Sequence, residues 1–190
     1  MAGAWPFDEY DMATWEESSR LLPHLLVVVN LAADYMVQSQ TVVYLNSQLG
    51  FYLHYHGDLA GARPYYERDL VICEKALGPD HPDTAQSLNN LGALLDSMGD
   101  LAGARPYYER ALAITEKALG PDHPDTAHSL NNLAILHYYE GDLVRAARLM
   151  RRALAIYEAR LGVQHPDTVS SRESLAVIEA TLERSALEEE

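Results

Sequence analysis

Two stretches of this chain, spaced 42 residues apart, have almost the same sequence. Residues 57–85 and 99–127 differ at three paired positions only: Asp69/Ala111, Val71/Ala113 and Cys73/Thr115. A period of this length is typical of stacked supersecondary units, in which each unit buries its leftover apolar face against the next. We therefore expect a repeat array whose function depends on surface recognition.

Each repeat has the spacing of two amphipathic helices. Over residues 82–98, apolar residues recur at i, i+3, i+7 and i+10, namely Leu88, Leu91, Leu95 and Met98. Pro82 suits the first turn of this helix, and Gly99-Asp100 ends it. A second helix is predicted over 101–119, and its inward residues are Leu101, Ala104, Tyr108, Ala111, Leu112, Thr115 and Leu119.

The same frame extends over most of the chain and predicts an all-α fold, an α-solenoid of three helix hairpins. The helix pairs are expected at 43–77, 85–119 and 127–161. A last helix over 166–184 caps the array, and residues 185–190 form an acidic tail. Residues 1–40 form an N-terminal segment, in which a helix over 20–38 caps the first repeat; Trp5 and Phe7 lie before that helix.

Composition limits the partners that this chain can bind. Its formal net charge of −14 argues against nucleic acid and against an anionic membrane surface, because both attract clustered Lys and Arg. The apolar run over 21–33 is too short to span a bilayer. The single cysteine, Cys73, cannot form an internal disulfide. We expect a cytoplasmic protein.

Catalytic and metal-binding chemistry finds little support in the sequence. His81, His123 and His165 each precede Pro-Asp, but they lie one repeat apart and cannot converge on one metal ion. We expect these histidines to form helix starts. No carboxylate pair is forced together by the repeat, and no Ser/His/Asp signature with a nucleophile turn occurs. The sequence predicts a non-enzymatic protein with no cofactor.

A family resemblance follows from four elements of the repeat: Leu-Asn-Asn-Leu-(Gly/Ala), Gly-Asp-Leu, Glu-Arg-Ala-Leu and Leu-Gly-Pro-Asp-His-Pro-Asp-Thr. Together they resemble the tetratricopeptide repeat (TPR), in the 42-residue variety found in kinesin light chains. The likeness covers residues 41–178 and is strongest at 88–92 and 130–134. It implies TPR helix hairpins that bind a protein or peptide in a concave groove lined by the first helix of each repeat.

The opening of the chain has a resemblance of its own. Trp-Pro-Phe-Asp at 5–8, Trp15 and Leu-Leu-Pro-His at 21–24 are similar to the segment that joins bacterial NB-ARC/STAND signalling ATPases to their C-terminal repeats. This resemblance implies that the chain is the sensor end of such a protein, or a truncated relative, without the ATPase. The sequence itself contains no GxxxxGK[ST] loop.

Helical periodicity also locates the groove, because its residues lie opposite the core stripe of each first helix. Between 86–98 and 128–140, seven of 13 positions differ, and four of the seven are groove positions. We hypothesise that the recognition helix diversifies on a duplicated scaffold; random drift is the alternative. The candidate groove residues are Gln86, Asn89, Asp96, His128, Asn131, Tyr138, Tyr139, Tyr44, His54 and Tyr55.

Two residue types carry the groove hypothesis. Asn89 and Asn131 each offer donors and an acceptor that suit an extended peptide backbone. The alternative is that Asn90 and Asn132, together with their neighbours, bond to the backbone of the adjacent repeat. Groove tyrosines supply the rigid amphipathic area that is enriched at interfaces, whereas Tyr66 and Tyr108 belong to the core by spacing.

We expect this chain to bind a peptide or protein segment in the groove. An alternative is a self-association scaffold that packs through the convex surface of the second helices, around residues 63–66 and 105–108. A third interpretation is a regulatory sensor that keeps a partnered ATPase inactive until a ligand arrives. The sequence does not identify the partner.

Overall fold

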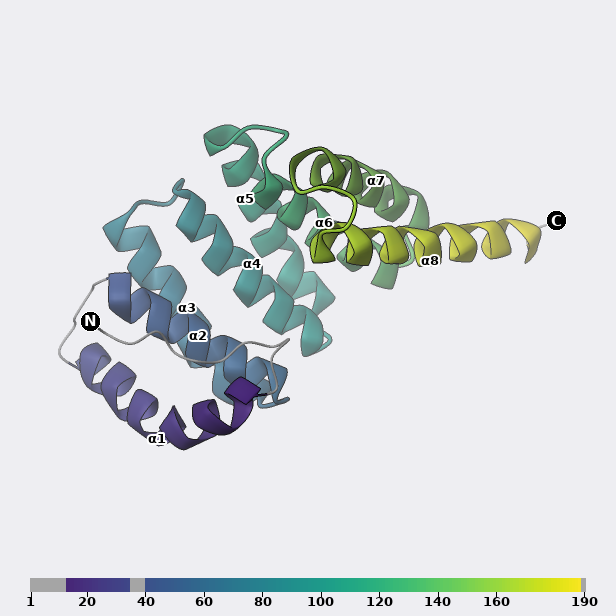
Figure 1. The fold of residues 1–190 in the computed structure, drawn as a ribbon. Helices are drawn as coiled ribbons and strands as arrows, with labels where there is room; N and C mark the ends of the chain where they lie inside the picture. The colour runs from purple at the N-terminus through teal and green to yellow at the C-terminus, as the bar shows by residue number, and fades with distance from the viewer. Residues whose placement is uncertain (1–12, 35–39, 189–190) are drawn as a thin grey trace. The chain divides into compact units, whose positions relative to one another are not determined.

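The computed structural model describes residues 13–34 and 40–188, and the regular elements in that part of the chain are all α-helices (Figure 1). The helices, in chain order, are α1 (Ala13–Asp34), α2 (Gln40–Tyr55), α3 (Leu59–Ala76), α4 (Pro82–Ser97), α5 (Leu101–Ala118), α6 (Pro124–Tyr139), α7 (Leu143–Arg160) and α8 (Pro166–Glu188). This confirms the predicted all-α helical repeat fold. Within the described residues, none of the helices has the length and hydrophobicity needed to span a bilayer.

The chain divides into two compact units at Pro79/Asp80, and each is described by itself. Unit 1 holds α1 and the α2–α3 hairpin. Unit 2 holds the α4–α5 and α6–α7 hairpins together with α8. The predicted array over 41–184 is therefore described in two parts, and its continuity across Pro79 stays a prediction.

Two helix boundaries differ from the predicted ranges at the ends of the chain. The first helix begins at Ala13, seven residues before the expected start, and the predicted end near Gln38 lies outside the described residues, as do Trp5 and Phe7. At the other end, α8 continues to Glu188, so residues 185–188 of the expected acidic tail are helical.

The His-Pro-Asp elements form helix starts, as predicted. His81 Nδ1 accepts the backbone N–H of Asp83 at 3.1 Å, and His123 does the same for Asp125 at 3.2 Å. The proline that follows each histidine occupies the first turn, where its missing N–H removes no helical hydrogen bond. The α4–α5 and α6–α7 pairs therefore begin at Pro82 and Pro124, three residues before the expected 85 and 127.

A short turn reverses the chain within each hairpin. Gly99 has φ +81°, a conformation that L side chains rarely adopt, and so it allows the chain to turn directly after α4. Asp100 then caps α5, because its carboxylate accepts the N–H of Gly103 at 2.9 Å. The same turn and cap recur one period earlier and one period later.

The predicted core stripe of α4 is confirmed except at its end. Leu88, Leu91 and Leu95 are buried, and so is Tyr108 on α5. Met98 is 44% exposed, so its assignment to the core stripe is wrong. The helix ends at Ser97, and Met98 lies in the C-cap position, where helical spacing no longer sets the direction of a side chain.

A glycine sets how closely α4 and α5 approach. A Cβ atom added at Gly92 would lie 2.7 Å from Cε1 and 2.9 Å from Cδ1 of Tyr108, which is too close for van der Waals contact. The tyrosine ring therefore packs on the bare backbone of α4. The same pairing occurs in unit 1, where a Cβ at Gly50 would lie 2.7 Å from Tyr66.

The α6–α7 hairpin makes the corresponding contact with different residues. One period after Gly92 and Tyr108 stand Ala134 and Met150, and both are buried in one apolar cluster with Ile178 of α8. A flexible methionine leaves room for the alanine methyl group that a tyrosine ring would exclude. The sequence difference Gly92/Ala134 is thus coupled to Tyr108/Met150.

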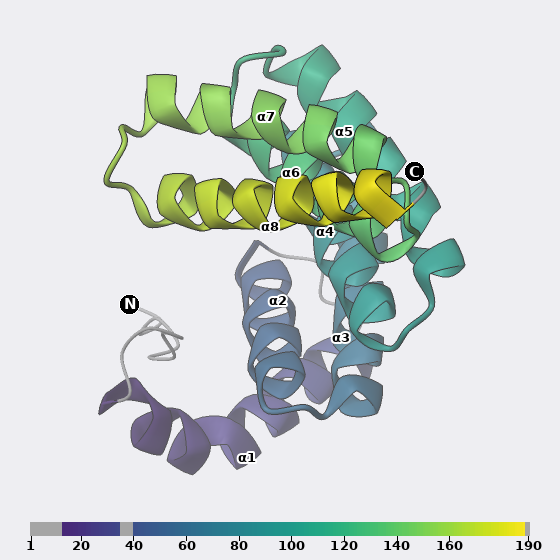
Figure 2. The same ribbon diagram turned by 90° about the vertical axis from the view of Figure 1, so that its right-hand side faces the viewer.

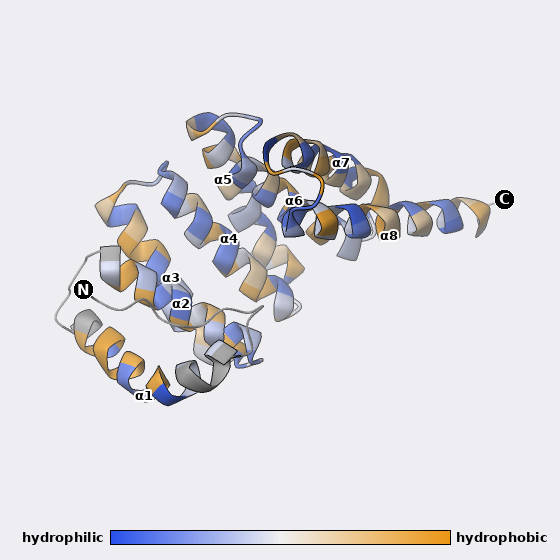
Figure 3. Ribbon diagram, viewed as in Figure 1, coloured by the Kyte–Doolittle hydropathy of each residue, from blue (hydrophilic) through white to orange (hydrophobic). Residues whose placement is uncertain are grey.

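Within unit 2 the helices pack in chain order, α4 on α5, α5 on α6, α6 on α7 and α7 on α8, and α4 also contacts α6. Figure 2 shows α7 and α8 lying side by side, joined by a loop. Figure 3 shows apolar and polar residues alternating along the helices, as expected for elements that bury one face. We call α4, α6 and α8 the A helices, and α5 and α7 the B helices.

The contact between Gly92 and Tyr108 yields a swap experiment. We predict that Gly92→Ala lowers the free energy of unfolding by about 1–3 kcal/mol, because the added methyl group overlaps the ring. Adding Tyr108→Met, which copies the next hairpin, should recover most of that loss. Chemical denaturation of the wild type, both single variants and the double variant measures the coupling. Additive effects of the two changes would contradict this account of the contact.

Candidate functional site

The predicted groove positions of unit 2 form one surface across the A helices. On α4 and α6, Gln86 and His128 are exposed and Asp96 and Tyr138 are half-buried. Tyr139, at the end of α6, is 62% exposed.

Asn89 is not on the open surface. Its side chain is only 2% exposed, and its Nδ2 donates to Ser129 Oγ of the next A helix at 3.0 Å. Ser129 in turn donates to the backbone carbonyl of Asp125 at 3.2 Å. Of the two roles that the sequence left open for Asn89, the structure shows the contact with the neighbouring repeat. Contact with a ligand stays a prediction.

A hydrogen bond between an asparagine and a serine recurs one repeat later, with the serine as the donor. Asn131 Oδ1 accepts from Ser171 Oγ of α8 at 3.3 Å, although Asn131 is half-buried. We call these two pairs the Asn–Ser ladder. The ladder joins each A helix to the next and thereby sets the spacing of the surface that they form. Gln86 has a local partner instead, because its Nε2 donates to Asn90 Oδ1 at 3.0 Å.

A hollow of about 300 Å³ lies between α6 and α8. From α6, its wall contains Ile135, Tyr138 and Tyr139. From α8, the wall includes Val177, which is 55% exposed, and Glu173. This is a mostly apolar site with one acidic group at its edge, a combination typical of sites that bind a side chain or a small ligand.

A second hollow, of about 380 Å³, lies between the ends of α4 and α6. Asp96, Ser97 and Leu101 line it on the side of the first hairpin, and Tyr139 lines it on the side of the second. Tyr139 is thus the wall that the two hollows share. The structure brings together Asp96, Tyr138 and Tyr139 of the predicted groove residues in these two hollows.

The contribution of α8 to this surface was not predicted, because the sequence indicated only a capping helix there. Ser170, Glu173 and Val177 stand one period after His128, Asn131 and Ile135, and all three line the α6–α8 hollow. Adding 42 to the groove positions of the previous repeat would have found them. The last helix therefore both packs on α7 and lines the hollow with α6.

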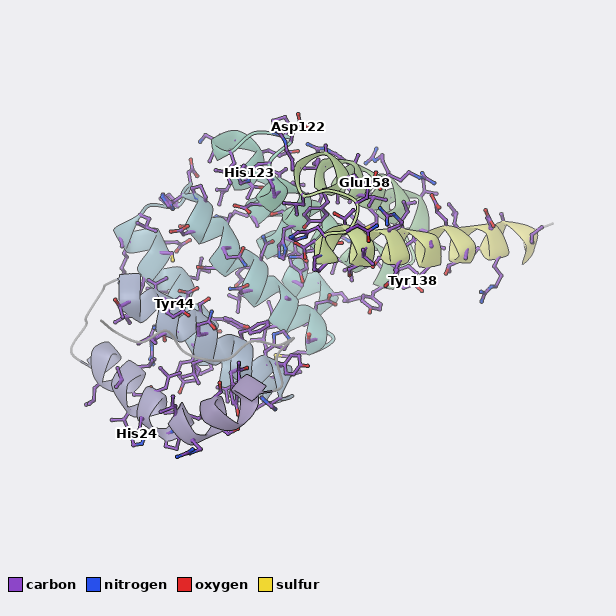
Figure 4. All side chains as sticks on the ribbon, in the orientation of Figure 1. His24, Tyr44, Asp122, His123, Tyr138 and Glu158 are labelled. Atoms are coloured by element: carbon purple, nitrogen blue, oxygen red, sulfur yellow. The ribbon has the colours of Figure 1, made fainter. Side chains whose placement is uncertain are left out.

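Unit 1 carries the remaining candidates on α2. Tyr44 and Tyr55 are exposed, and Tyr44 is marked in Figure 4. The rings of Tyr55 and Phe51 lie 6.4 Å apart, centroid to centroid. His54 is half-buried with its ring edge against Tyr66 at 6.2 Å, and burial lowers the pKa of His54. The structure therefore places the ring of Tyr55 beside that of Phe51 on α2, and the ring of His54 against Tyr66 of α3.

Two of the packing differences between repeats form a polar pair. Leu95 and Met98 are replaced one period later by His137 and Glu140. His137 is buried, and its Nδ1 lies 3.3 Å from Glu140 Oε2, which also accepts from Arg105 at 2.5 Å. The two substitutions thus act together, because the carboxylate contacts both the histidine and the arginine of α5.

Burial shifts the pKa of one carboxyl in a hollow and of one tyrosine in the core. Burial raises the pKa of the Asp96 carboxyl, whose charged form is only partly solvated. Burial also raises the pKa of Tyr108, with a further contribution from the charge of Asp96. Tyr108 therefore remains a neutral core residue. In the described part of the chain, no three His, Cys, Asp or Glu side chains gather in a way that could hold a metal ion.

These features define a class of protein: an array of helix hairpins with a hollowed surface along its A helices and a repeated B-helix scaffold. Comparison with known families then identifies it. The family model described as "Tetratricopeptide repeat" matches residues 41–117 and 97–159, which is more than half of the chain. The chain belongs to the tetratricopeptide repeat family. The matching model indicates no catalytic family.

Solved structures share the fold. A crystal structure of a putative kinesin light chain from Podospora anserina, with nearly identical TPR-like repeats, has a TM-score of 0.69 at 24% identity; 93% of this chain and 83% of that chain are covered. A second crystal structure of that protein gives a TM-score of 0.70. BtubC (BKLC) from P. vanneervenii has a TM-score of 0.61 at 20% identity, covering 88% of this chain and 74% of that one.

A curated relative matches only one repeat length. The Clustered mitochondria protein of Arabidopsis thaliana is 46% identical over 43 residues. The match spans 23% of this chain and 3% of that protein. It supports the repeat and carries no further information on the function of this chain.

The Asn–Ser ladder gives a stability prediction. Asn89→Ala should lower the free energy of unfolding by about 1 kcal/mol, because it removes a buried hydrogen bond between repeats. In a double-mutant cycle with Ser129→Ala, we expect a coupling of about 0.5–1.5 kcal/mol. Gln86→Ala, on the exposed side of the same helix, is the control and should change stability by less than about 0.5 kcal/mol. A coupling of zero would show that the Asn89–Ser129 pair does not stabilise the contact between the repeats.

Proposed function

We propose that this chain is a non-enzymatic interaction domain that binds a peptide or protein segment on its A-helix surface. The observation that carries the proposal is the pair of hollows on either side of Tyr139. They lie on α4, α6 and α8, at the end of α4 where Asp96 and Ser97 are replaced one period later by Tyr138 and Tyr139. Repeats that share a core and differ along one surface are the organisation expected of a recognition array.

The distribution of exposed apolar area supports the same surface. Tyr139 and Val177 are more than half exposed and line one hollow between α6 and α8. Large exposed apolar residues that border a hollow favour a partner that covers them, because burial of their surface contributes to binding. We further propose a cytoplasmic setting and, from the resemblance of residues 5–24, a role as the sensor part of a signalling ATPase.

The alternative is self-association through the second helix of each hairpin, where little aromatic surface is exposed. Of the two repeated Tyr-Tyr pairs, Tyr65, Tyr66 and Tyr108 are buried and Tyr107 is half-buried. These rings already serve the core of each unit. The repeated tyrosines are thus explained by packing, without a partner copy.

A matched pair of variants tests the A-helix surface. We predict that Tyr139→Ala/Val177→Ala loses the partners that the wild type recovers from a native lysate, because both residues line the same hollow. The control, Val144→Ala/Val163→Ala, removes two valines of similar exposure that lie outside both hollows and should keep those partners. Melting curves check that both variants fold. Equal recovery of partners by all three proteins would contradict the proposal.

Light scattering tests the alternative. We expect the full chain to keep the mass of a monomer as its concentration rises, because the rings of the B helices are committed to the core. Size-exclusion chromatography with multi-angle light scattering measures that mass directly. A mass that increases with concentration, and that returns to the monomer value in Arg63→Glu/Arg105→Glu, would favour the scaffold instead.

A further inference from the structure

The charged side chains of the A-helix surface are mostly acidic. Helices α4 and α6 contain no Lys or Arg, and the first basic residue of α8, Arg172, is bonded to Glu158 of α7 at 2.8 Å. Apart from His128, the charged groove positions of unit 2 are therefore acidic: Asp96 in the α4–α6 hollow and Glu173 in the α6–α8 hollow.

These two carboxylates differ from other acidic groups of the same unit. Glu140 contacts Arg105 at 2.5 Å and Glu179 contacts Arg151 at 2.6 Å. Within the residues that the structure describes, Asp96 and Glu173 have no Lys or Arg at ion-pair distance. Burial raises the pKa of Asp96, as expected for a carboxylate whose charge is not compensated.

The apolar part of the surface lies beside these acids. Ile135, Val177 and Ile178 line the α6–α8 hollow together with Tyr138, and Tyr139 separates this hollow from Asp96. The surface thus offers an apolar site and an acidic site on the two sides of one exposed ring. Because Asp96 and Tyr139 line the same hollow, a cation bound there meets both a carboxylate and an aromatic ring.

We propose that this surface binds a peptide segment with a large apolar side chain in the α6–α8 hollow and a lysine or arginine beside Asp96. The inference rests on the proposed function, since it names the partner chemistry of the same surface. Because Tyr139 lines both hollows, the two side chains stand within a few residues of each other on an extended peptide, in which two residues span about 6.6 Å. The net charge of −14 attracts such a cationic segment over longer distances.

Selection from a phage-displayed library of random dodecapeptides tests the proposal, with the full chain as bait. We expect the enriched peptides to carry Lys or Arg within three residues of Trp, Phe, Leu, Ile or Met. Synthetic versions should bind Asp96→Asn/Glu173→Gln about three- to tenfold more weakly than the wild type. The control, Glu109→Gln/Asp122→Asn, changes the net charge equally but lies outside both hollows and should bind like the wild type.

The other outcomes separate this inference from the proposed function. Enriched peptides that bind but are acidic or uncharged, or that weaken equally in the two charge variants, overturn the inference and leave peptide binding intact. Peptides that bind Tyr139→Ala/Val177→Ala as well as the wild type place the site elsewhere and overturn both. A selection that enriches no peptide over an empty support also contradicts both.

Discussion

The close approach of two helices at one contact governs each hairpin. In the second repeat Tyr108 lies against the bare backbone at Gly92, and in the third Met150 lies near the methyl group of Ala134. This contact, with the glycine turn and aspartate cap beside it, fixes how an A helix lies on its B helix. Everything that the A helices present to a partner depends on it, because their outer residues are positioned only through this packing.

The same constraint bears on how the repeats differ. Helix α5 is held between α4 and α6, so a change on either side of it disturbs a packed interface. Its buried residues Ala111 and Ile114 recur one period later in α7 as Ala153 and Ile156, although α5 and α7 differ at 10 of 18 paired positions. The last two residues of α4 are replaced one period later by tyrosines that border the hollows. Packing therefore preserves part of the buried stripe, while the outer end of the A helix changes between repeats.

Periodicity predicted the helices, the histidine caps and most of the core, because these depend on one hairpin at a time. It failed where a neighbouring helix, or the end of a helix, determines whether a side chain is buried. Asn89 stands opposite the core stripe of its own helix, yet it is buried because the next A helix, with Ser129, covers it. Met98 continues the stripe but follows the last residue of α4. Val177 was missed because the period was not continued into α8.

The central claim is that partners meet the A helices and that the repeated B helices serve as scaffold. Two natural tyrosines allow a direct comparison, Tyr139 at the end of α6 and Tyr107 on α5. A photo-crosslinking phenylalanine analogue at each position in turn, followed by irradiation in native lysate, measures which surface a partner touches. We predict covalent adducts from position 139 and none from position 107. Adducts from position 107 alone would contradict this account of the protein.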